Sequence, residues 1–305
     1  MQPTIYRPSD VTNFSYKPRT AEITDEAMSK RFRPAVNDKF RIALLNIDNQ
    51  NDFVDPTGGL PVPGAPEDAR RLIEFIYGNL ESITSITASL DTHLNFHIFF
   101  PTWWRDAQGR APSTTQPTYL SYDDIKSGKM RPIIDPKWTT EYVKKLGYMM
   151  VWPLHCVLGT PGHNLIPALS EAITFHSVAR STQPHFLTKG TNARTEHYGI
   201  FKAEVEDPQD PGTQLNSYIL DSIAQNDRIY VAGQAKSHCV LRSMQQMVEY
   251  FEVVQPDVIK KIYFLMDCTS SVQAPGIDFE KIANDELTKM AAKGVVLVNS
   301  TDPIR

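Results

Sequence analysis

The sequence has few cysteines, little net charge and no long apolar run, and each absence excludes a class of protein. Its 305 residues include three cysteines, too few and odd in number for a disulfide scaffold, so we expect thiols in a reducing cytoplasm. A net charge of -4 argues against nucleic acid or a membrane surface as a partner, because phosphate binding needs clustered positive charge. No apolar run reaches the roughly 18 residues of a membrane span, and the N-terminus lacks an export signal. These absences predict a cytoplasmic protein that acts on a small molecule.

The chain divides into an arm and one large domain. Residues 1–39 mix prolines with charges and show no sustained hydrophobic period, which predicts a partly ordered N-terminal arm. Residues 40–305 form the predicted domain, within which 102–137 carries tryptophan and tyrosine among Gly, Pro, Ser and Asp. A segment of this length without a regular pattern indicates an inserted lid or a subunit contact. We therefore expect a homo-oligomer in which the arm or the insertion touches a neighbouring subunit.

Short apolar runs alternate with amphipathic helical patterns from residue 40 onward. The runs are rich in β-branched residues and nearly continuous in apolar character, at 42–47, 83–90, 228–232, 262–266 and 295–298. Helical periodicity lies between them, at 66–80, 165–175, 214–224, 237–251 and 279–292. Strand alternating with helix predicts an α/β fold, a doubly wound (Rossmann-like) parallel sheet with helices on both faces.

Reactive side chains fall at the carboxyl ends of the predicted strands, where ligands bind in such sheets. Asp48 closes the first run, Asp91 closes the second, and Lys189 follows a short apolar run that begins at His185. Loss of solvation at the end of a buried strand raises the pKa of Asp48 and suits it to proton transfer. A lysine at such a position needs a partner, because burying an unpaired charge is costly.

Cys239 lies where a strand, a glycine-containing turn and a helix follow one another in Val231-Ala232-Gly233-Gln234-Ala235-Lys236-Ser237-His238-Cys239-Val240. A helix N-terminus lowers the pKa of a thiol and presents backbone N–H groups to a developing oxyanion. Cys239 is therefore the candidate nucleophile. We interpret Cys156 and Cys268 as packing residues, since free cysteine is commonly buried.

One carboxylate and three histidines have the ligand types of a divalent metal site. In an extended chain Asp91 and His93 share one face, His97 follows four residues later, and His155 lies far downstream. The set predicts one divalent ion, zinc first, with iron and manganese as alternatives.

With these residues assembled, the chain resembles the nicotinamidase branch of the isochorismatase-like cysteine hydrolases. The resemblance covers about 40–300 and includes Lys189-Gly190 between its last two motifs. Its other segments are Asp48-Asn49-Gln50-Asn51-Asp52-Phe53, Asp91-Thr92-His93 with His97, Trp152-Pro153-Leu154-His155-Cys156-Val157-Leu158-Gly159-Thr160, and 233–240.

The resemblance implies a role for each matched residue. Cys239 would be the nucleophile, Asp48 the base that takes its proton, and Lys189 the cation that holds the Asp48 charge. The backbone amides of Ala235 and Cys239 would form the oxyanion hole, after a cis bond between Gln234 and Ala235. Asp91, His93 and His155 would be the metal ligands, with His97 as a further ligand or in the second shell. Phe53 and Trp152 would hold the pyridine ring of the substrate between them.

Nicotinamide hydrolysis to nicotinate and ammonia is the implied reaction, with three alternatives. Another small amide or carbamoyl compound would keep the chemistry, although relatives acting on non-pyridine amides often lack the metal site. Isochorismatase-type ether hydrolysis needs no cysteine, so Cys239 argues against it. A non-catalytic metal- or ligand-binding protein stays open because Lys236-Ser237 departs from the usual pair beside the nucleophile, as does Tyr198-Gly199 after the lysine segment.

Overall fold

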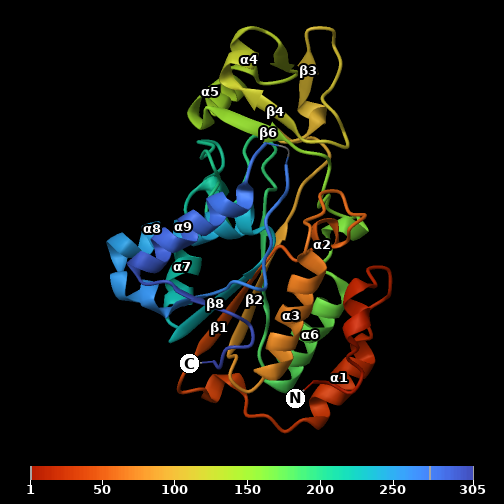
Figure 1. The fold of residues 1–305 in the computed structure, drawn as a ribbon, viewed down its shortest axis with the longest axis vertical. Helices are drawn as coiled ribbons and strands as arrows, with labels where there is room; N and C mark the ends of the chain where they lie inside the picture. Colours follow the sequence, from red (N-terminus) through yellow and green to blue (C-terminus); the bar gives the residue numbers. More distant parts are fainter. Residues whose placement is uncertain (1, 275, 305) are drawn as a thin grey trace.

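A six-stranded parallel sheet forms the centre of the molecule (Figure 1). The structure is a computed structural model that describes residues 2–274 and 276–304. Each strand pairs in parallel with its neighbours. The strand order is β10 (Val296–Val298), β9 (Ile262–Leu265), β8 (Arg228–Gly233), β1 (Ile42–Ile47), β2 (Ser85–Asp91) and β7 (His185–Lys189).

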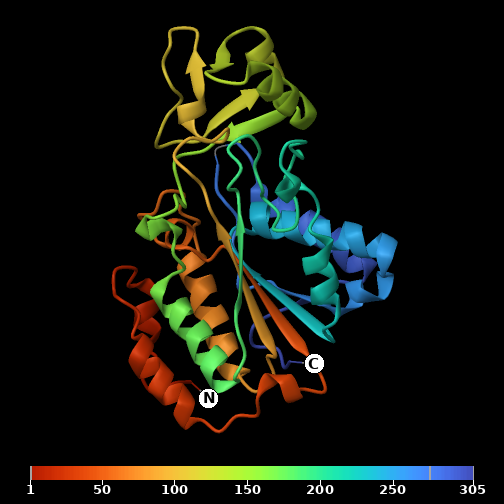
Figure 2. The ribbon, with the colours of Figure 1, turned by 180° about the vertical axis from the view of Figure 1, so that it is seen from behind.

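Helices cover both faces of this sheet, as Figures 1 and 2 show. Helices α3 (Ala65–Gly78) and α6 (Pro167–Ala179) lie on one face. The other face carries α7 (Ser217–Ala224), α8 (Leu241–Val254) and α9 (Phe279–Lys293). A short helix, α2 (Asn51–Val54), follows β1. The predicted doubly wound α/β fold is confirmed.

Strand β1 is buried along its whole length because it has packed helices on both sides. Ile42 and Leu44 belong to the core that contains residues of α3 and α6. Leu45 and Ile47 belong to the core that contains residues of α7, α8 and α9. Alternate side chains of one strand thus serve two hydrophobic cores. No helix among residues 2–274 and 276–304 is long and apolar enough to cross a membrane.

The N-terminal segment contains helix α1 (Thr20–Ser29), which packs against α6. Ile23 and Ala27 are fully buried, and Arg19 forms an ion pair with the buried Glu171 at 2.8 Å. The hydrophobic pattern of this segment was too short to predict a helix, because its buried face consists of these two side chains. The segment therefore docks on its own chain along α6.

The segment predicted to be irregular, 102–137, contains regular structure and is part of a larger unit that extends to Val151. Two small antiparallel sheets pair β3 (Trp104–Asp106) with β5 (Met130–Pro132) and β4 (Thr118–Ser121) with β6 (Tyr148–Val151). Helices α4 (Tyr122–Lys126) and α5 (Pro136–Leu146) complete the unit. Figures 1 and 2 place it over one end of the sheet, opposite the end where both chain termini lie. Its own hydrophobic cluster includes Phe99 and Trp152, so its position is fixed by packing.

Candidate active site

Asp48, Lys189 and Cys239 meet at the carboxyl edge of the sheet. Asp48 directly follows β1, Lys189 ends the edge strand β7, and Cys239 lies in a π-helical turn (Lys236–Val240) between β8 and α8. The Lys189 Nζ atom lies 3.0 Å from Asp48 Oδ2 and 3.6 Å from Cys239 Sγ. The structure thus brings the three predicted catalytic residues together around one ammonium group.

The close approach of β8 to β1 depends on Gly233. Its φ angle is +130°, and a Cβ atom there would lie 2.0 Å from the carbonyl oxygen of Ile47. Glycine is therefore required at this position, since a side chain would clash with the β1 backbone. The peptide bond between the next two residues, Gln234 and Ala235, is cis, as the resemblance implies.

Asp48 is fully buried, and burial raises the pKa of its carboxyl group while the Lys189 ammonium opposes that rise. The Ser89 hydroxyl donates a hydrogen bond of 2.6 Å to Asp48 Oδ1, which leaves Oδ2 to face Lys189. A carboxylate with a raised pKa is a better proton acceptor than an exposed one. The expected effect of burial on Asp48 is therefore present.

Burial also raises the pKa of the Cys239 thiol well above its usual range, against the lowering effect of Lys189. This corrects the expectation that the helix N-terminus lowers the pKa of Cys239. Cys239 is 7% exposed, and the loss of solvation exceeds the stabilisation of a thiolate by Lys189. A base must therefore take the thiol proton before or during attack. Burial likewise raises the pKa values of Cys156 and Cys268.

A narrow cavity in front of Cys239, here called the inner cavity, contains the predicted substrate contacts. Phe53, Trp152 and Ala235 line it together with Cys239. The remaining lining residues are Leu60, Asp91, Phe99, His155, Glu196, Tyr198, His238 and Val272. Phe53 and Trp152 are buried, and the Trp152 Nε1–H group donates to the Tyr198 hydroxyl at 3.0 Å. The cavity thus has aromatic walls beside Cys239 and beside Asp91 and His155.

Asp91, His93 and His155 form a buried group whose atoms could hold a metal ion. His155 Nδ1 donates to the carbonyl oxygen of Pro153 at 2.7 Å, so its Nε2 atom carries a lone pair. That lone pair faces Asp91 Oδ2 at 3.4 Å, and His93 Nδ1 faces the same oxygen at 3.3 Å. His93 Nδ1 has no hydrogen-bond partner among the described residues. One cation would satisfy all three atoms, so these residues fit a divalent metal.

Glu196 belongs to the site and was missed in the sequence. Its Oε2 atom lies 2.8 Å from His93 Nε2 and 3.8 Å from His97 Nδ1, which makes His93, His97 and Glu196 a second possible metal group. Burial raises the pKa of Glu196, but His93 outweighs it and lowers the pKa to about 2. Glu196 therefore stays ionised and accepts a hydrogen bond from His93 Nε2 at 2.8 Å, which leaves His93 Nδ1 facing Asp91. The available signal was Tyr198-Gly199, which begins two residues after Glu196 and departs from the usual pair after the lysine segment.

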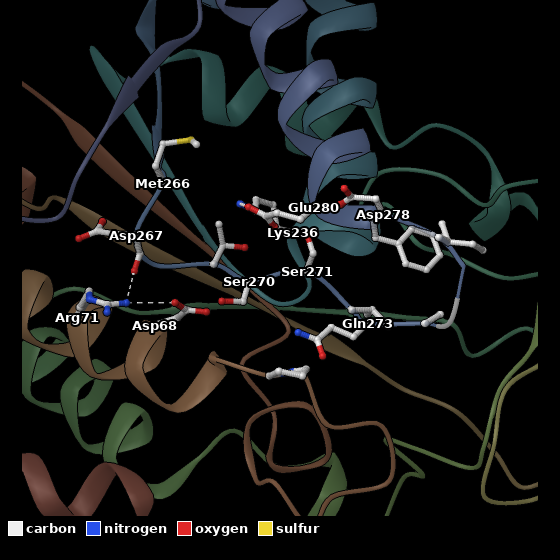
Figure 3. Close-up of a pocket in the computed structure, with 16 residues that line it drawn as sticks. Asp68, Arg71, Lys236, Met266, Asp267, Ser270, Ser271, Gln273, Asp278 and Glu280 are labelled. Carbon is white, nitrogen blue, oxygen red and sulfur yellow. Dashed lines mark hydrogen bonds and ion pairs between the residues drawn. The ribbon is translucent and has the colours of Figure 1, made fainter.

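Lys236 lines an open cleft of about 880 Å³, and Cys239 is not among the residues that line this cleft (Figure 3). Its ammonium group forms an ion pair with Glu280 of α9 and a 3.3 Å hydrogen bond with Asn284. In the same cleft, Asp68 accepts a 3.0 Å hydrogen bond from Gln234, the residue before Ala235. Lys236 thus anchors the turn to α9, and Glu280 neutralises its charge.

The parallel sheet carries helices on both faces and a buried cysteine, aspartate and lysine at its carboxyl edge. Solved structures of nicotinamidases share this fold with the chain. The nicotinamidase–pyrazinamidase of Acinetobacter baumannii matches with a TM-score of 0.54 and 20% identity, over 87% of this chain and 99% of that one. The yeast nicotinamidase bound to the inhibitor nicotinaldehyde matches with a TM-score of 0.56 and 18% identity, over 85% of this chain and 99% of that one.

In sequence, the chain is similar to the nicotinamidase of Saccharomyces cerevisiae. The two are 22% identical over 197 residues, which cover 65% of this chain and 76% of the yeast protein. No family model matches the sequence. The resemblance to the nicotinamidase branch is thus supported both by a sequence relative and by the shared fold.

Proposed function

We propose that the chain is a metal-dependent cysteine amidohydrolase that converts nicotinamide to nicotinate and ammonia. The observation that carries this proposal is the Lys189 ammonium group, which lies 3.0 Å from Asp48 Oδ2 and 3.6 Å from Cys239 Sγ. Cys239 of this trio lines the inner cavity, whose walls include the aromatic residues Phe53 and Trp152 and, from the possible metal group, Asp91 and His155. Cysteine, base and cation within reach of one another are the components of nucleophilic amide hydrolysis.

Asp48 takes the thiol proton as Cys239 attacks the carboxamide carbon. The S–C bond forms, the C–N bond breaks, and the nitrogen leaves as ammonia with the proton that Asp48 returns. A water molecule then hydrolyses the thioester to the acid and regenerates the thiol. The raised pKa of Asp48 favours this transfer, and the raised pKa of Cys239 keeps the resting thiol protonated until the attack.

The Lys189 ammonium group stabilises the negative charge, whether it resides on Asp48 or on Cys239. Burial lowers the pKa of Lys189, but Asp48 and Asp91 outweigh it and hold the pKa well above its usual range. The ammonium group therefore remains charged through the reaction. The backbone N–H groups of Ala235 and Cys239 would stabilise the oxyanion, and losing one such donor typically costs about 3 to 4 kcal/mol in other hydrolases.

Asp91, His93 and His155 would hold the divalent metal, with Glu196 orienting His93. Carboxylate and imidazole ligands suit zinc, iron or manganese. When bound, the metal would supply a Lewis acid for a ring nitrogen or a water at the cavity wall. Phe53 and Trp152 would hold a flat ring between them, which favours nicotinamide among small amides.

The experiment is ammonia release from nicotinamide by the purified protein, with its metal content measured and with Cys239→Ala as the control. The proposal expects release that requires Cys239 and falls after chelation. Metal binding without ammonia release from nicotinamide would contradict the substrate. Failure with a panel of small amides as well would favour the non-catalytic metal-binding alternative.

A further inference from the structure

A second hollow, here called the outer groove, adjoins the inner cavity. It has a volume of about 370 Å³, and its outer walls include Tyr119, Tyr148, Leu241, Arg242, Phe279 and Ile282. Phe99, Tyr198 and His238 line both the outer groove and the inner cavity. The rings of Tyr198 and His238 lie 5.4 Å apart, between their centroids, on the shared wall. The groove and the inner cavity therefore share a wall made of these three side chains.

Apolar side chains of the groove are unusually exposed. Tyr119, Tyr148 and Ile282 are 56%, 59% and 48% exposed, and the two tyrosine rings stack with centroids 5.5 Å apart. Tyr119 and Tyr148 come from β4 and β6 of the 102–151 unit, whereas Ile282 comes from α9. Exposed apolar groups that gather in a concave site indicate a binding surface. The unit thus adds one wall to a groove that the central domain alone would leave open.

The charged groups in the groove lining already have partners. Arg242 lies 3.2 Å from Glu204 and 3.6 Å from Glu249. Burial lowers the pKa of His238 to about 4, so its ring is neutral near pH 7. Among the described lining residues, the groove offers no unpaired charge, which favours an uncharged and apolar occupant.

We propose that the outer groove is a subsite for the apolar part of an extended amide substrate, a carboxamide whose ring carries an aryl or alkyl group. This inference rests on the proposed amidase function and extends its substrate class. The volume lies within the roughly 300 to 1,000 Å³ of small-molecule sites. A group seated in the groove would lie against Tyr198 and His238, which places its carboxamide in the direction of Cys239. Binding of a second copy of the chain in the groove would not explain why the groove shares the Tyr198 and His238 rings with the inner cavity.

The test compares nicotinamide with nicotinamides that carry a phenyl group at different ring positions. The parent protein should hydrolyse at least one phenyl derivative with a higher kcat/KM than nicotinamide. Tyr148→Ala and Ile282→Ala should lower that value roughly tenfold, as expected for lost aromatic and aliphatic burial. Both variants should leave nicotinamide hydrolysis within about twofold, since neither residue lines the inner cavity. Val253→Ala, which removes an 84% exposed apolar side chain outside the groove, should change neither substrate.

Three results would overturn the inference. They are equal losses on nicotinamide and the phenyl derivatives, no preference for any derivative, or a dimer that Tyr148→Ala converts to monomer in light scattering. Calorimetry with the Cys239→Ala variant separates this inference from the proposed function. Binding of a phenyl derivative that Tyr148→Ala weakens, without hydrolysis by the parent, would support the subsite and contradict the amidase. Hydrolysis of nicotinamide without any binding in the groove would contradict the subsite alone.

Discussion

At the scale of single residues, Asp48 offers the sharpest test because its replacement removes a base while leaving Lys189 satisfied. In Asp48→Asn, Lys189 keeps Asp91 at 2.8 Å and the carbonyl oxygen of His197 at 2.9 Å. We expect kcat for nicotinamide to fall by about 10² to 10⁴-fold, the usual contribution of a general base. Steady-state ammonia release and circular dichroism would measure activity and folding.

Ser89→Ala is the matched control for Asp48→Asn. It removes the 2.6 Å hydrogen bond to Asp48 but keeps the carboxylate. Its kcat should fall by less than that of Asp48→Asn, because a hydrogen bond to a charged group contributes roughly 1.5 to 3 kcal/mol and the carboxylate itself remains. An Asp48→Asn protein that works within about threefold of the parent would rule out Asp48 as the base.

Lys236 is a cation close in sequence to Cys239, and in contrast to Asp48 we expect its replacement to leave the activity nearly unchanged. Because its ammonium group pairs with Glu280, Lys236→Met should keep kcat/KM within about threefold, and the half-exposed Glu280 can be hydrated instead. Glu280→Gln is the control that breaks the same pair from α9. A pH–rate profile displaced by Lys236→Met but not by Glu280→Gln would show that the charge does act on the thiol.

At the scale of elements, helix α1 should contribute to stability but not to catalysis. Ile23 is fully buried between α1 and the rest of the core, so Ile23→Ala should lower the free energy of unfolding by about 2 to 4 kcal/mol. Met28, on the same helix, is 62% exposed, and Met28→Ala should change it by no more than about 0.5 kcal/mol. Urea denaturation measures both values. Equal midpoints would mean that α1 does not stay docked in solution.

The sequence predicted the central sheet well and the peripheral elements poorly, for a physical reason. The predicted runs at 42–47 and 279–292 differ little from β1 (Ile42–Ile47) and α9 (Phe279–Lys293), because many consecutive side chains of each carry the pattern. In α1 the buried residues are Ile23 and Ala27, too few for a period to be visible. The short strands β3 and β5 of the 102–151 unit cover three residues each, less than strand patterns require.

Within the site, the sequence located side chains that end strands and missed those that depend on loop geometry. Asp48, Asp91 and Lys189 were predicted to converge because parallel strands end at one edge, and the structure bears out their proximity. Glu196 reaches His93 from an irregular segment after β7, where no pattern predicts direction. The pKa of Cys239 was also misjudged, since burial depends on the surrounding residues of the whole fold.

At the scale of the whole molecule, a buried neutral histidine makes the free energy of unfolding depend on pH. Burial lowers the pKa of His176 from 6.5 to about 4, and its Nε2 atom lies 2.8 Å from the carbonyl oxygen of Ile83. Between these pH values the unfolded chain binds more protons than the folded one, so stability falls as pH falls. His176 alone should remove about 2 kcal/mol between pH 7.5 and pH 5.

The variant His176→Gln tests this dependence, because an amide can still donate to Ile83 but does not titrate. Urea unfolding at several pH values should show a shallower loss of stability for the variant than for the parent. Identical slopes would mean that His176 is protonated in the folded protein or remains neutral in the unfolded one.

The strand order also has a consequence for the time course of folding. Strand β1 pairs with β2 and with the far more distant β8, and Lys189 arrives on β7, the last strand at one edge. Pairings between distant segments form slowly, because a long loop must close before any contact stabilises it. Helical circular dichroism should therefore recover before enzymatic activity when the denatured chain is diluted from urea. The proposed active site would be among the last parts of the molecule to fold. The time at which ammonia release returns would therefore report when the sheet is complete.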